Sequence, residues 1–471
     1  MFKLFHDKLS YDLMQDIKNF LIIVGVSLSG LILLSANPGY FSHDELQKYD
    51  HVLRYGFDHY ISTYVKLQQT AAFGSPVRPF AFFVQGVLAL FMDKYPVLVH
   101  LFSVMTHAVV GCLLYVVANR FSKTKSLSLT IAIIFVLNPL AVLATGWSAA
   151  LMDRCYILFG LITLLCAEKF IRQNASALSL VWICLWSAMS ILSKETAMIL
   201  PGLLLLIVAA DLSSIKSKRF WYAGMAWSIP ILLFMVYRLP SIIASFGAPS
   251  VADYKASVTN VPDGLFIYMA YPFIYSLTEA NNWVFISSLG MWAGVFIHFL
   301  VVYFVGVKVG IKASIVYVLM YLLFLAPVLL IPIKGAHYMY GSSLVLSVGL
   351  GVIIFNKADK YYIGRIFGSA ALLILLIHTV VLQNFVYTQG SCMNKAMIST
   401  EAMYQANGRP AAVDFQAEPG APNYILMKIN TGREQIGSWY PVKLTVSNWG
   451  DKSPDGALSL AMTAQCLVYK K

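Results

Sequence analysis

Long apolar segments separated by short polar connectors make up most of this 471-residue chain. A helix needs roughly 17–25 mostly apolar residues to cross a bilayer, and about eleven segments approach that length. They cover residues 20–36, 96–118, 128–146, 150–167, 178–193, 196–211, 221–238, 284–306, 313–333, 341–356 and 366–384. The pattern predicts an all-α polytopic membrane protein with about eleven transmembrane helices.

The composition agrees with this prediction. The chain is 59% hydrophobic and only 12% charged, whereas a soluble domain carries about 25% charged residues. The first apolar segment is too long for a cleavable signal and lacks a small-residue cleavage site, so we predict a retained first helix. The net charge of +12 lies in short connectors rather than in one basic tract, which excludes a nucleic-acid-binding arm.

Basic residues gather in every second connector. One set of connectors holds Lys3, Lys8, Lys18, Arg120, Lys123, Lys125, Lys169, Arg172, Lys216, Lys218, Arg219, Lys308, Lys312, Lys357, Lys360 and Arg365. The alternate short connectors carry only Arg154, Lys194 and Lys334. Because cytoplasmic loops are rich in Lys and Arg, this predicts a cytoplasmic N-terminus and a C-terminus on the outer face.

Two long outer loops divide the predicted transmembrane domain, which covers residues 1–384. The first, 37–95, contains an amphipathic stretch at 44–64 that predicts one helix lying on the membrane surface. Residues 80–92 are apolar but too short to span, so we predict a second interfacial helix there. The second loop, 239–283, is rich in Pro, Gly, Ser and aromatic residues and includes Glu279.

The character of the chain changes near residue 385. Residues 385–471 are polar, and alternating stretches at 424–429 and 442–446 predict a small exported domain with β content. Cys392 and Cys466 bracket this domain and in an oxidising compartment would form a disulfide; the alternative is two buried thiols. The other cysteines, Cys112, Cys155, Cys166 and Cys184, lie in apolar segments and are expected to be packing residues.

Ionisable side chains at the outer ends of the predicted spans are the candidates for function, because charge in or beside a bilayer is costly. The set comprises Asp44, Glu45, Arg78, His107, Asp153, Arg154, Lys194, Glu195, Arg238, Lys334 and His337. Since these ends converge in a bundle, the side chains could line one cavity that holds both signs of charge. Such a cavity suits an anionic substrate and a general base.

Each of these candidates also has a structural interpretation. Asp44, and less so Glu45, could take a proton from an acceptor hydroxyl, or the two acids could simply cap the helix that begins there. Arg78, between Pro76 and Pro79, could bind a phosphate bidentately or meet lipid headgroups. Lys194 could reach a phosphate with Glu195 positioning it, or the two could form a bare salt bridge. Tyr338 and Tyr340, beside His337, are typical of an interfacial aromatic belt.

No cofactor is predicted from the sequence. It contains no HExxH, no paired CxxC, no DxD, no P-loop and no GxSxG. A divalent cation held by Asp44 and Glu45 is an open alternative without a supporting motif.

Taken in order, these motifs resemble the GT-C superfamily of integral-membrane glycosyltransferases, which use polyprenyl-phosphate sugars. The acidic pair of the first outer loop matches His43-Asp44-Glu45, and the family's Arg-Pro matches Arg78-Pro79. The other similar stretches are Val99-His100-Leu101 to His107-Ala108, Asn138-Pro139 leading to Trp147-Ser148 and Asp153, Ser193-Lys194-Glu195-Thr196-Ala197 with Leu200-Pro201, and Ala336-His337-Tyr338-Met339-Tyr340. These last pieces are most similar to the O-mannosyltransferase branch, where an arginine commonly stands in the place of His337.

The resemblance implies an inverting transfer of a sugar from a polyprenyl-phosphate carrier such as undecaprenyl phosphate. Asp44 would be the base and Glu45 its catalytic neighbour. The donor phosphate would be bound by Arg78, Lys194, Arg238, Lys334 and His337, and the substrates would be positioned by Asp153, Glu195, Tyr338 and Tyr340. Size and topology look like bacterial O-antigen-modifying glucosyltransferases, which implies a hexose such as glucose, a lipid-linked O-antigen acceptor, and a periplasmic active site in the inner membrane.

Other classes of protein also place charges in a helical bundle. The main alternative is a secondary transporter or lipid flippase, although such proteins often show inverted repeats and broken midplane helices. A GT-C enzyme that modifies protein or lipid A, or a non-catalytic assembly protein, also stays open. For the glycosyltransferase, the expected partners are a polyprenyl-phosphate sugar donor, a glycan acceptor and membrane lipids, and no nucleic acid.

Overall fold

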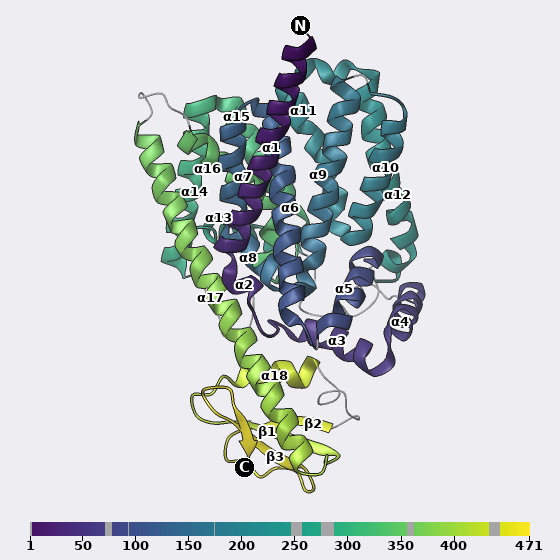
Figure 1. Cartoon of the computed structure of the whole chain (residues 1–471), viewed down its shortest axis with the longest axis vertical. Coiled ribbons are helices and arrows are strands. Elements are labelled where there is room, and N and C mark those ends of the chain that lie inside the picture. The colour runs from purple at the N-terminus through teal and green to yellow at the C-terminus, as the bar shows by residue number, and fades with distance from the viewer. Residues whose placement is uncertain are drawn as a thin grey trace.

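The computed structural model describes residues 2–70, 78–92, 94–173, 175–245, 257–274, 287–355, 362–432 and 443–471. Most of these residues form one helical bundle, with a small β-sheet at one end and the N-terminus at the other (Figure 1). The helices of the bundle are α1 (Phe2–Gly30), α2 (Ile32–Ser35), α6 (Pro96–Ser122), α7 (Lys125–Val136), α8 (Pro139–Gly146), α9 (Leu151–Arg172), α10 (Leu178–Ser193), α11 (Leu204–Ala210), α12 (Lys218–Ser245), α14 (Ser288–Val309), α15 (Ile311–Leu329), α16 (Tyr340–Phe355) and α17 (Tyr362–Ala406).

Shorter helices connect and cover these. In the first outer loop they are α3 (His43–Tyr55), α4 (Phe57–Thr70) and α5 (Pro79–Met92). Between the long helices lie α13 (Val261–Ala270) and the 3-10 helices η1 (Ser148–Ala150), η2 (Glu195–Leu203), η3 (Leu212–Lys216), η5 (Val258–Asn260) and η6 (Ala336–Met339). Parts of the second long loop, including Glu279, lie outside the described residues.

Seven described helices are long and apolar enough to cross a membrane, or eight if the bent pair α7 and α8 is counted as one span. The chain is therefore a mostly helical, multi-pass membrane protein, but the count is lower than the eleven predicted. The three other predicted segments are also helical, but each is too short or too interrupted to count as a membrane-spanning helix. The first is interrupted at Leu31, α10 has only 16 residues, and Pro201 lies in the 3-10 helix that precedes α11.

The bend between α7 and α8 measures 56° and follows from local chemistry. Pro139 stands in the first turn of α8, where its missing N–H costs nothing. The side chain of Asn138 caps that turn by accepting a hydrogen bond from the Leu140 N–H at 3.1 Å. Because a proline cannot continue the preceding helix, a new helix starts at this point in a new direction.

The first outer loop differs from the prediction of one helix over 44–64. Gly56 separates α3 from α4 with a φ of +82°, a conformation that glycine adopts without strain. The helix predicted at 80–92 is present as α5, which begins at Pro79. The three helices lie together at the same end of the bundle as the sheet (Figure 1).

The C-terminal part combines a sheet with one helix, α18 (Asn423–Gly432). The strands are β1 (Ala412–Ala417), β2 (Lys443–Ser447), β3 (Leu458–Met462) and β4 (Val468–Lys470), in the order β2-β1-β3-β4. β1 runs parallel to both β2 and β3, and only β4 is antiparallel to its neighbour. The strand expected at 442–446 is β2, but residues 424–429 are helical and lie in α18, so that part of the prediction was wrong.

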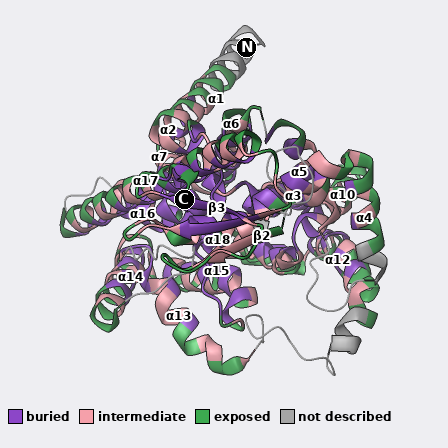
Figure 2. Ribbon diagram, turned by 90° about the horizontal axis from the view of Figure 1, so that it is seen from below, coloured by how far each residue is buried: buried purple, intermediate pink, exposed green. Residues whose placement is uncertain are grey.

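The long helix α17 carries the chain out of the bundle into this region without a break at residue 385. Cys392 on α17 forms a disulfide with Cys466, which precedes β4. A hydrophobic core joins the sheet and α18 to α3 and α5, and includes Leu46, Tyr49 and Ile425. Seen from that end, the sheet and α18 lie over the centre of the bundle (Figure 2). The sheet region is thus packed onto the first outer loop.

Candidate active site

The chain enters α3 through a capping box. Ser42 is the N-cap residue and Glu45 is the third residue of the helix, an arrangement that satisfies amides which the first helical turn leaves unpaired. Asp44 lies at the second position, so the alternative interpretation, in which Asp44 is the N-cap residue, does not hold.

Both carboxylate oxygens of Glu45 are engaged by the backbone. Oε2 accepts hydrogen bonds from the N–H groups of Phe41 at 2.7 Å and Ser42 at 2.9 Å, and Oε1 accepts one from Ser148 at 2.6 Å. The side chain is only 1% exposed. Glu45 therefore anchors α3 to the turn at η1, and this geometry speaks against its predicted role as a catalytic carboxylate.

Asp44 is held differently. Its side chain is 39% exposed, and Oδ1 lies 3.1 Å from Nε2 of His43. Burial raises the pKa of Asp44, but the hydrogen bond and charge of His43 and the charge of Lys48 outweigh this and leave the pKa below its usual value. Asp44 is thus an ionised carboxylate at neutral pH with an accessible edge. For Lys48, burial lowers the pKa to about 8, against the opposing charges of Asp44 and Glu45.

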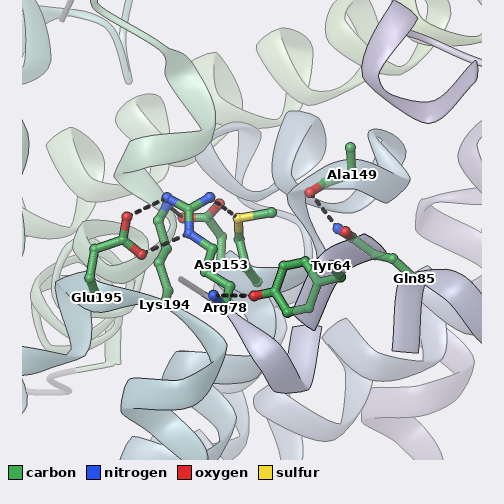
Figure 3. Close-up of polar contacts among 8 residues, drawn as sticks. Tyr64, Arg78, Gln85, Ala149, Asp153, Lys194 and Glu195 are labelled. Carbon is green, nitrogen blue, oxygen red and sulfur yellow. Dashed lines mark hydrogen bonds and ion pairs between the residues drawn. The ribbon is translucent and has the colours of Figure 1, made fainter. Parts of the chain in front are cut away.

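The predicted Arg78 and Glu195 form a bidentate ion pair. Nε of Arg78 donates to Oε2 of Glu195 at 2.7 Å, and Nη2 donates to Oε1 at 2.8 Å (Figure 3). The Arg78 backbone N–H also donates to the Tyr64 hydroxyl at 2.7 Å, and Nη1 contacts the Met152 sulfur. Burial opposes ionisation of Glu195, but the Arg78 guanidinium prevails and holds its pKa at about 2.

The next residue in the chain makes a second ion pair. Lys194 links α10 to η2 in an extended conformation, and neighbouring side chains point to opposite sides of an extended backbone. While Glu195 reaches Arg78, Lys194 Nζ donates to Oδ1 of Asp153 in the first turn of α9 (Figure 3). The two side chains are only 5% and 2% exposed. Two residues adjacent in sequence therefore join three parts of the bundle.

Aromatic side chains surround this cluster. The Lys194 ammonium lies 5.1 Å from the ring centroid of Tyr338. The ring of His337 lies 4.8 Å from that of Trp147 and 4.1 Å from that of Tyr338. Four buried atoms here have no hydrogen-bond partner, namely Trp147 Nε1, Ser148 Oγ, Asp153 Oδ2 and His337 Nδ1.

Three other predicted residues are placed elsewhere. Lys334 donates to the Ile331 carbonyl at 2.8 Å and to the Asn260 carbonyl at 3.4 Å, which holds it beside α13. The hydroxyl of Tyr340 lies 2.9 Å from Nδ1 of His107 inside the bundle. Arg238 stands on α12 and is half-buried there.

The structure gathers Arg78, Asp153, Lys194, Glu195, His337 and Tyr338, with Asp44 close enough for its charge to act on His337.

An apolar groove of about 680 Å³ opens beside the Arg78–Glu195 pair. α4, α5, α10 and α12 line it, and Tyr64 and Pro79 stand at the end that adjoins Arg78. A second apolar cavity, of about 450 Å³, lies near the opposite end of the bundle and has Ser122 and Lys312 among its lining residues. The sequence analysis identified neither cavity, because each is formed by helices distant in sequence.

Sequence reasoning also missed Tyr64, Met152 and Lys48 as neighbours of the site. Only Lys48 carried a local signal, since it stands four residues after Asp44 and so on the same face of a helix. No group of three or more His, Cys, Asp or Glu side chains suited to a metal ion occurs within the described ranges.

No protein-family model matches the sequence, and no curated protein matches it. Several solved structures of membrane glycosyltransferases are similar to it. The oligosaccharyltransferase of Archaeoglobus fulgidus in the apo form has 9% identity and a TM-score of 0.46 over 89% of this chain and 64% of its own. This chain thus spans slightly less than two thirds of that protein.

Two further structures are similar at the same level. The arabinofuranosyltransferase AftD from Mycobacteria has 15% identity and a TM-score of 0.49 over 90% of this chain but 31% of its own. ArnT from Cupriavidus metallidurans, bound to undecaprenyl phosphate, has 12% identity and a TM-score of 0.45 over 94% of this chain and 92% of its own. Similarity this remote does not assign the chain to a family.

Proposed function

We propose that this chain is a GT-C-type glycosyltransferase that moves a sugar from a polyprenyl-phosphate carrier to an acceptor hydroxyl. One observation carries the proposal, which is that the apolar groove adjoins the charged cluster through Tyr64 and Pro79. Tyr64 lines the groove with its ring and accepts a hydrogen bond from the Arg78 N–H through its hydroxyl. A prenyl chain in the groove would therefore bring its phosphate to Arg78.

The cluster has the donors that a phosphodiester requires. Arg78 donates two N–H groups to Glu195. Among the described residues, its Nη1 contacts the Met152 sulfur, a weak acceptor that a phosphate oxygen would displace. Lys194 bonds one oxygen of Asp153 and otherwise faces the Tyr338 ring. Because Glu195 and Asp153 keep both cations in place, the donors are preorganised for the charge that develops on the leaving phosphate.

Asp44 supplies the base in this proposal. Its ionised and accessible carboxylate takes the proton of the acceptor hydroxyl as that oxygen attacks the anomeric carbon. The bond from the anomeric carbon to the phosphate oxygen breaks on the opposite face, and polyprenyl phosphate leaves with both bonding electrons. One displacement inverts the anomeric centre and needs no covalent nucleophile. Buried polar groups usually have partners, so the four unpaired atoms of Trp147, Ser148, Asp153 and His337 are suited to sugar hydroxyls.

The finer parts of the proposal rest on the sequence resemblance. They are a hexose such as glucose, a lipid-linked O-antigen acceptor, and an active site on the periplasmic face of a bacterial inner membrane. In that orientation the basic connectors at the N-terminal end of the bundle would be cytoplasmic.

Replacement of Asp44 by asparagine tests the proposal. We expect Asp44→Asn to lower sugar transfer in membranes at least about 100-fold, since a general base contributes about 10²–10⁴-fold. Transfer is followed with a radiolabelled polyprenyl-phosphate hexose and isolated cell-envelope glycan. Asp58→Asn, an exposed acid on the neighbouring α4, is the matched control. Near-normal transfer by Asp44→Asn would exclude Asp44 as the base, and donor movement across the membrane without transfer would favour the transporter alternative.

A further inference from the structure

The segment Asn37–Ser42, which leads into α3, determines where Asp44 lies. Its backbone is bonded by residues far away in sequence. The Gly39 carbonyl lies 2.7 Å from Nε2 of His100 on α6, and the Asn37 side chain donates to the Val386 carbonyl of α17 at 3.3 Å. Gly39 itself packs directly on Gly390 of α17. The segment is thus braced from two sides of the bundle.

The third brace comes from the C-terminal region. Lys428 on α18 donates from Nζ to the Phe41 carbonyl at 2.8 Å and to Oε1 of Gln389 on α17, also at 2.8 Å. The ammonium also lies 4.7 Å from the ring centroid of Phe41 and 5.5 Å from that of Tyr424. Lys428 therefore links α18 both to α17 and to Phe41, which stands two residues before the start of α3.

Both backbone polar groups of Phe41 are hydrogen-bonded to side chains. Its carbonyl accepts from Lys428, and its N–H donates to Glu45, which also accepts from the Ser148 N–H. A continuous path of hydrogen bonds therefore runs from α18 through the start of α3 to η1. Asp44 stands between Ser42 and Glu45 within this path.

We infer that Lys428 is a positioning residue of the proposed active site, and that through it the C-terminal sheet region supplies one of the three braces that hold Asp44 in place. The inference rests on the proposed function. It goes beyond that function because it gives the C-terminal region a role in positioning the proposed base. That region contributes none of the residues of the charged cluster.

The electrostatics of Lys428 agree with this role. Burial lowers the pKa of Lys428 to about 8, while the charge of Glu45 acts in the opposite direction. At neutral pH Lys428 is therefore protonated in most molecules. Its ammonium group then donates the hydrogen bonds that the Phe41 carbonyl and the Gln389 side chain accept. A charged donor makes a stronger hydrogen bond to a carbonyl than a neutral one does.

Replacement of Lys428 by methionine is the test, made in the full-length protein with its disulfide intact. Because small displacements at a reacting centre cost up to about 100-fold, we expect kcat for sugar transfer to fall about tenfold. The donor KM should stay within about twofold, because the phosphate-binding cluster is untouched. Lys428→Arg keeps a charged donor and should restore most of kcat. Lys470→Met, which removes an exposed lysine of the same region that bonds Asn407, should behave as the wild type.

A second measurement reports on the brace itself. Hydrogen–deuterium exchange of the amides of Phe41 to Leu46 should be faster in Lys428→Met than in the wild type or in Lys470→Met. Wild-type kcat together with wild-type exchange would overturn the inference. If Lys428→Met does not accumulate in membranes, Lys428→Gln, which keeps an amide donor without the charge, replaces it in both measurements. A wild-type protein without transfer activity would overturn the proposed function instead, and exchange would still decide whether Lys428 braces α3.

Discussion

Asp44 on α3 and the two carboxylates at the junction of α9, α10 and η2 are held by different kinds of partner, although Glu195 is 37% exposed and so nearly as accessible as Asp44. Asp44 is 39% exposed, and its closest charged partner is the histidine next to it. Asp153 and Glu195 are paired with Lys194 and Arg78, which come from other parts of the chain. An acid with an accessible edge can exchange a proton with a substrate, whereas an acid bound to a cation keeps that cation in position. Under the proposed function, this difference in partners favours Asp44 as the base and the paired cluster as the binding site for the donor phosphate.

The largest expected effect comes from breaking the buried pair. Lys194→Ala leaves Asp153 as an unpaired charge in the bundle, and removal of one partner of a buried ion pair costs about 3–5 kcal/mol of stability. We expect a clear fall of the melting temperature in detergent as well as loss of transfer.

A double variant separates these two effects. Asp153→Asn combined with Lys194→Met removes both charges at nearly constant volume and should recover most of the stability while transfer stays low. A normal melting temperature for Lys194→Ala would show that the pair does not stabilise the fold, and recovery of transfer in the double variant would remove Lys194 from the donor site.

A smaller effect is expected at Arg78. Arg78→Lys keeps the charge but loses the planar fork that holds Glu195 and leaves one edge for phosphate, and the two side chains are not equivalent at bidentate sites. We expect the donor KM to rise about tenfold, which corresponds to about 1.4 kcal/mol of binding free energy. Arg120→Lys, on an exposed position at the other end of the bundle, serves as the control. An unchanged donor KM would contradict a phosphate contact at Arg78.

The smallest effect concerns pH. The pKa of Glu195 is about 2 in the folded protein against an ordinary value of 4.5. A carboxylate with a depressed folded pKa contributes stability that is present above its unfolded pKa and is lost as the pH falls toward the folded one. Because Glu195 is 37% exposed, solvent screening keeps this contribution small.

We therefore expect the difference in melting temperature between the wild type and Glu195→Gln to shrink between pH 4.5 and about pH 2. The measurement is a series of thermal unfolding curves in detergent across that range. A difference that does not change with pH would mean that the charge of Glu195 is not what stabilises the pair.

Local patterns predicted the helices well. Each apolar segment identified from the sequence is helical over most of its described residues, because period and composition are properties of a short stretch of chain. Residues 424–429 are an exception, since their alternation predicted a strand and the tertiary structure made them α18. Period alone does not decide between helix and strand in so short a stretch. The single helix predicted over 44–64 failed at Gly56 for a similar reason, because one residue with a positive φ interrupts an otherwise regular pattern.

The sequence by itself determined that this is a multi-pass membrane protein, that an acidic pair follows its first apolar segment, and that Arg78, Lys194 and Glu195 stand at the ends of apolar segments. Only the tertiary structure decided which partner each of them contacts. Arg78 and Glu195 are 117 residues apart, and Lys428 and Phe41 are 387 apart. The backbone hydrogen bonds of a helix join residues that are near in sequence. Which helix ends meet depends instead on the packing of the whole bundle. The same packing separated Asp44 from Glu45, leaving one carboxylate accessible and turning the other toward three backbone amides.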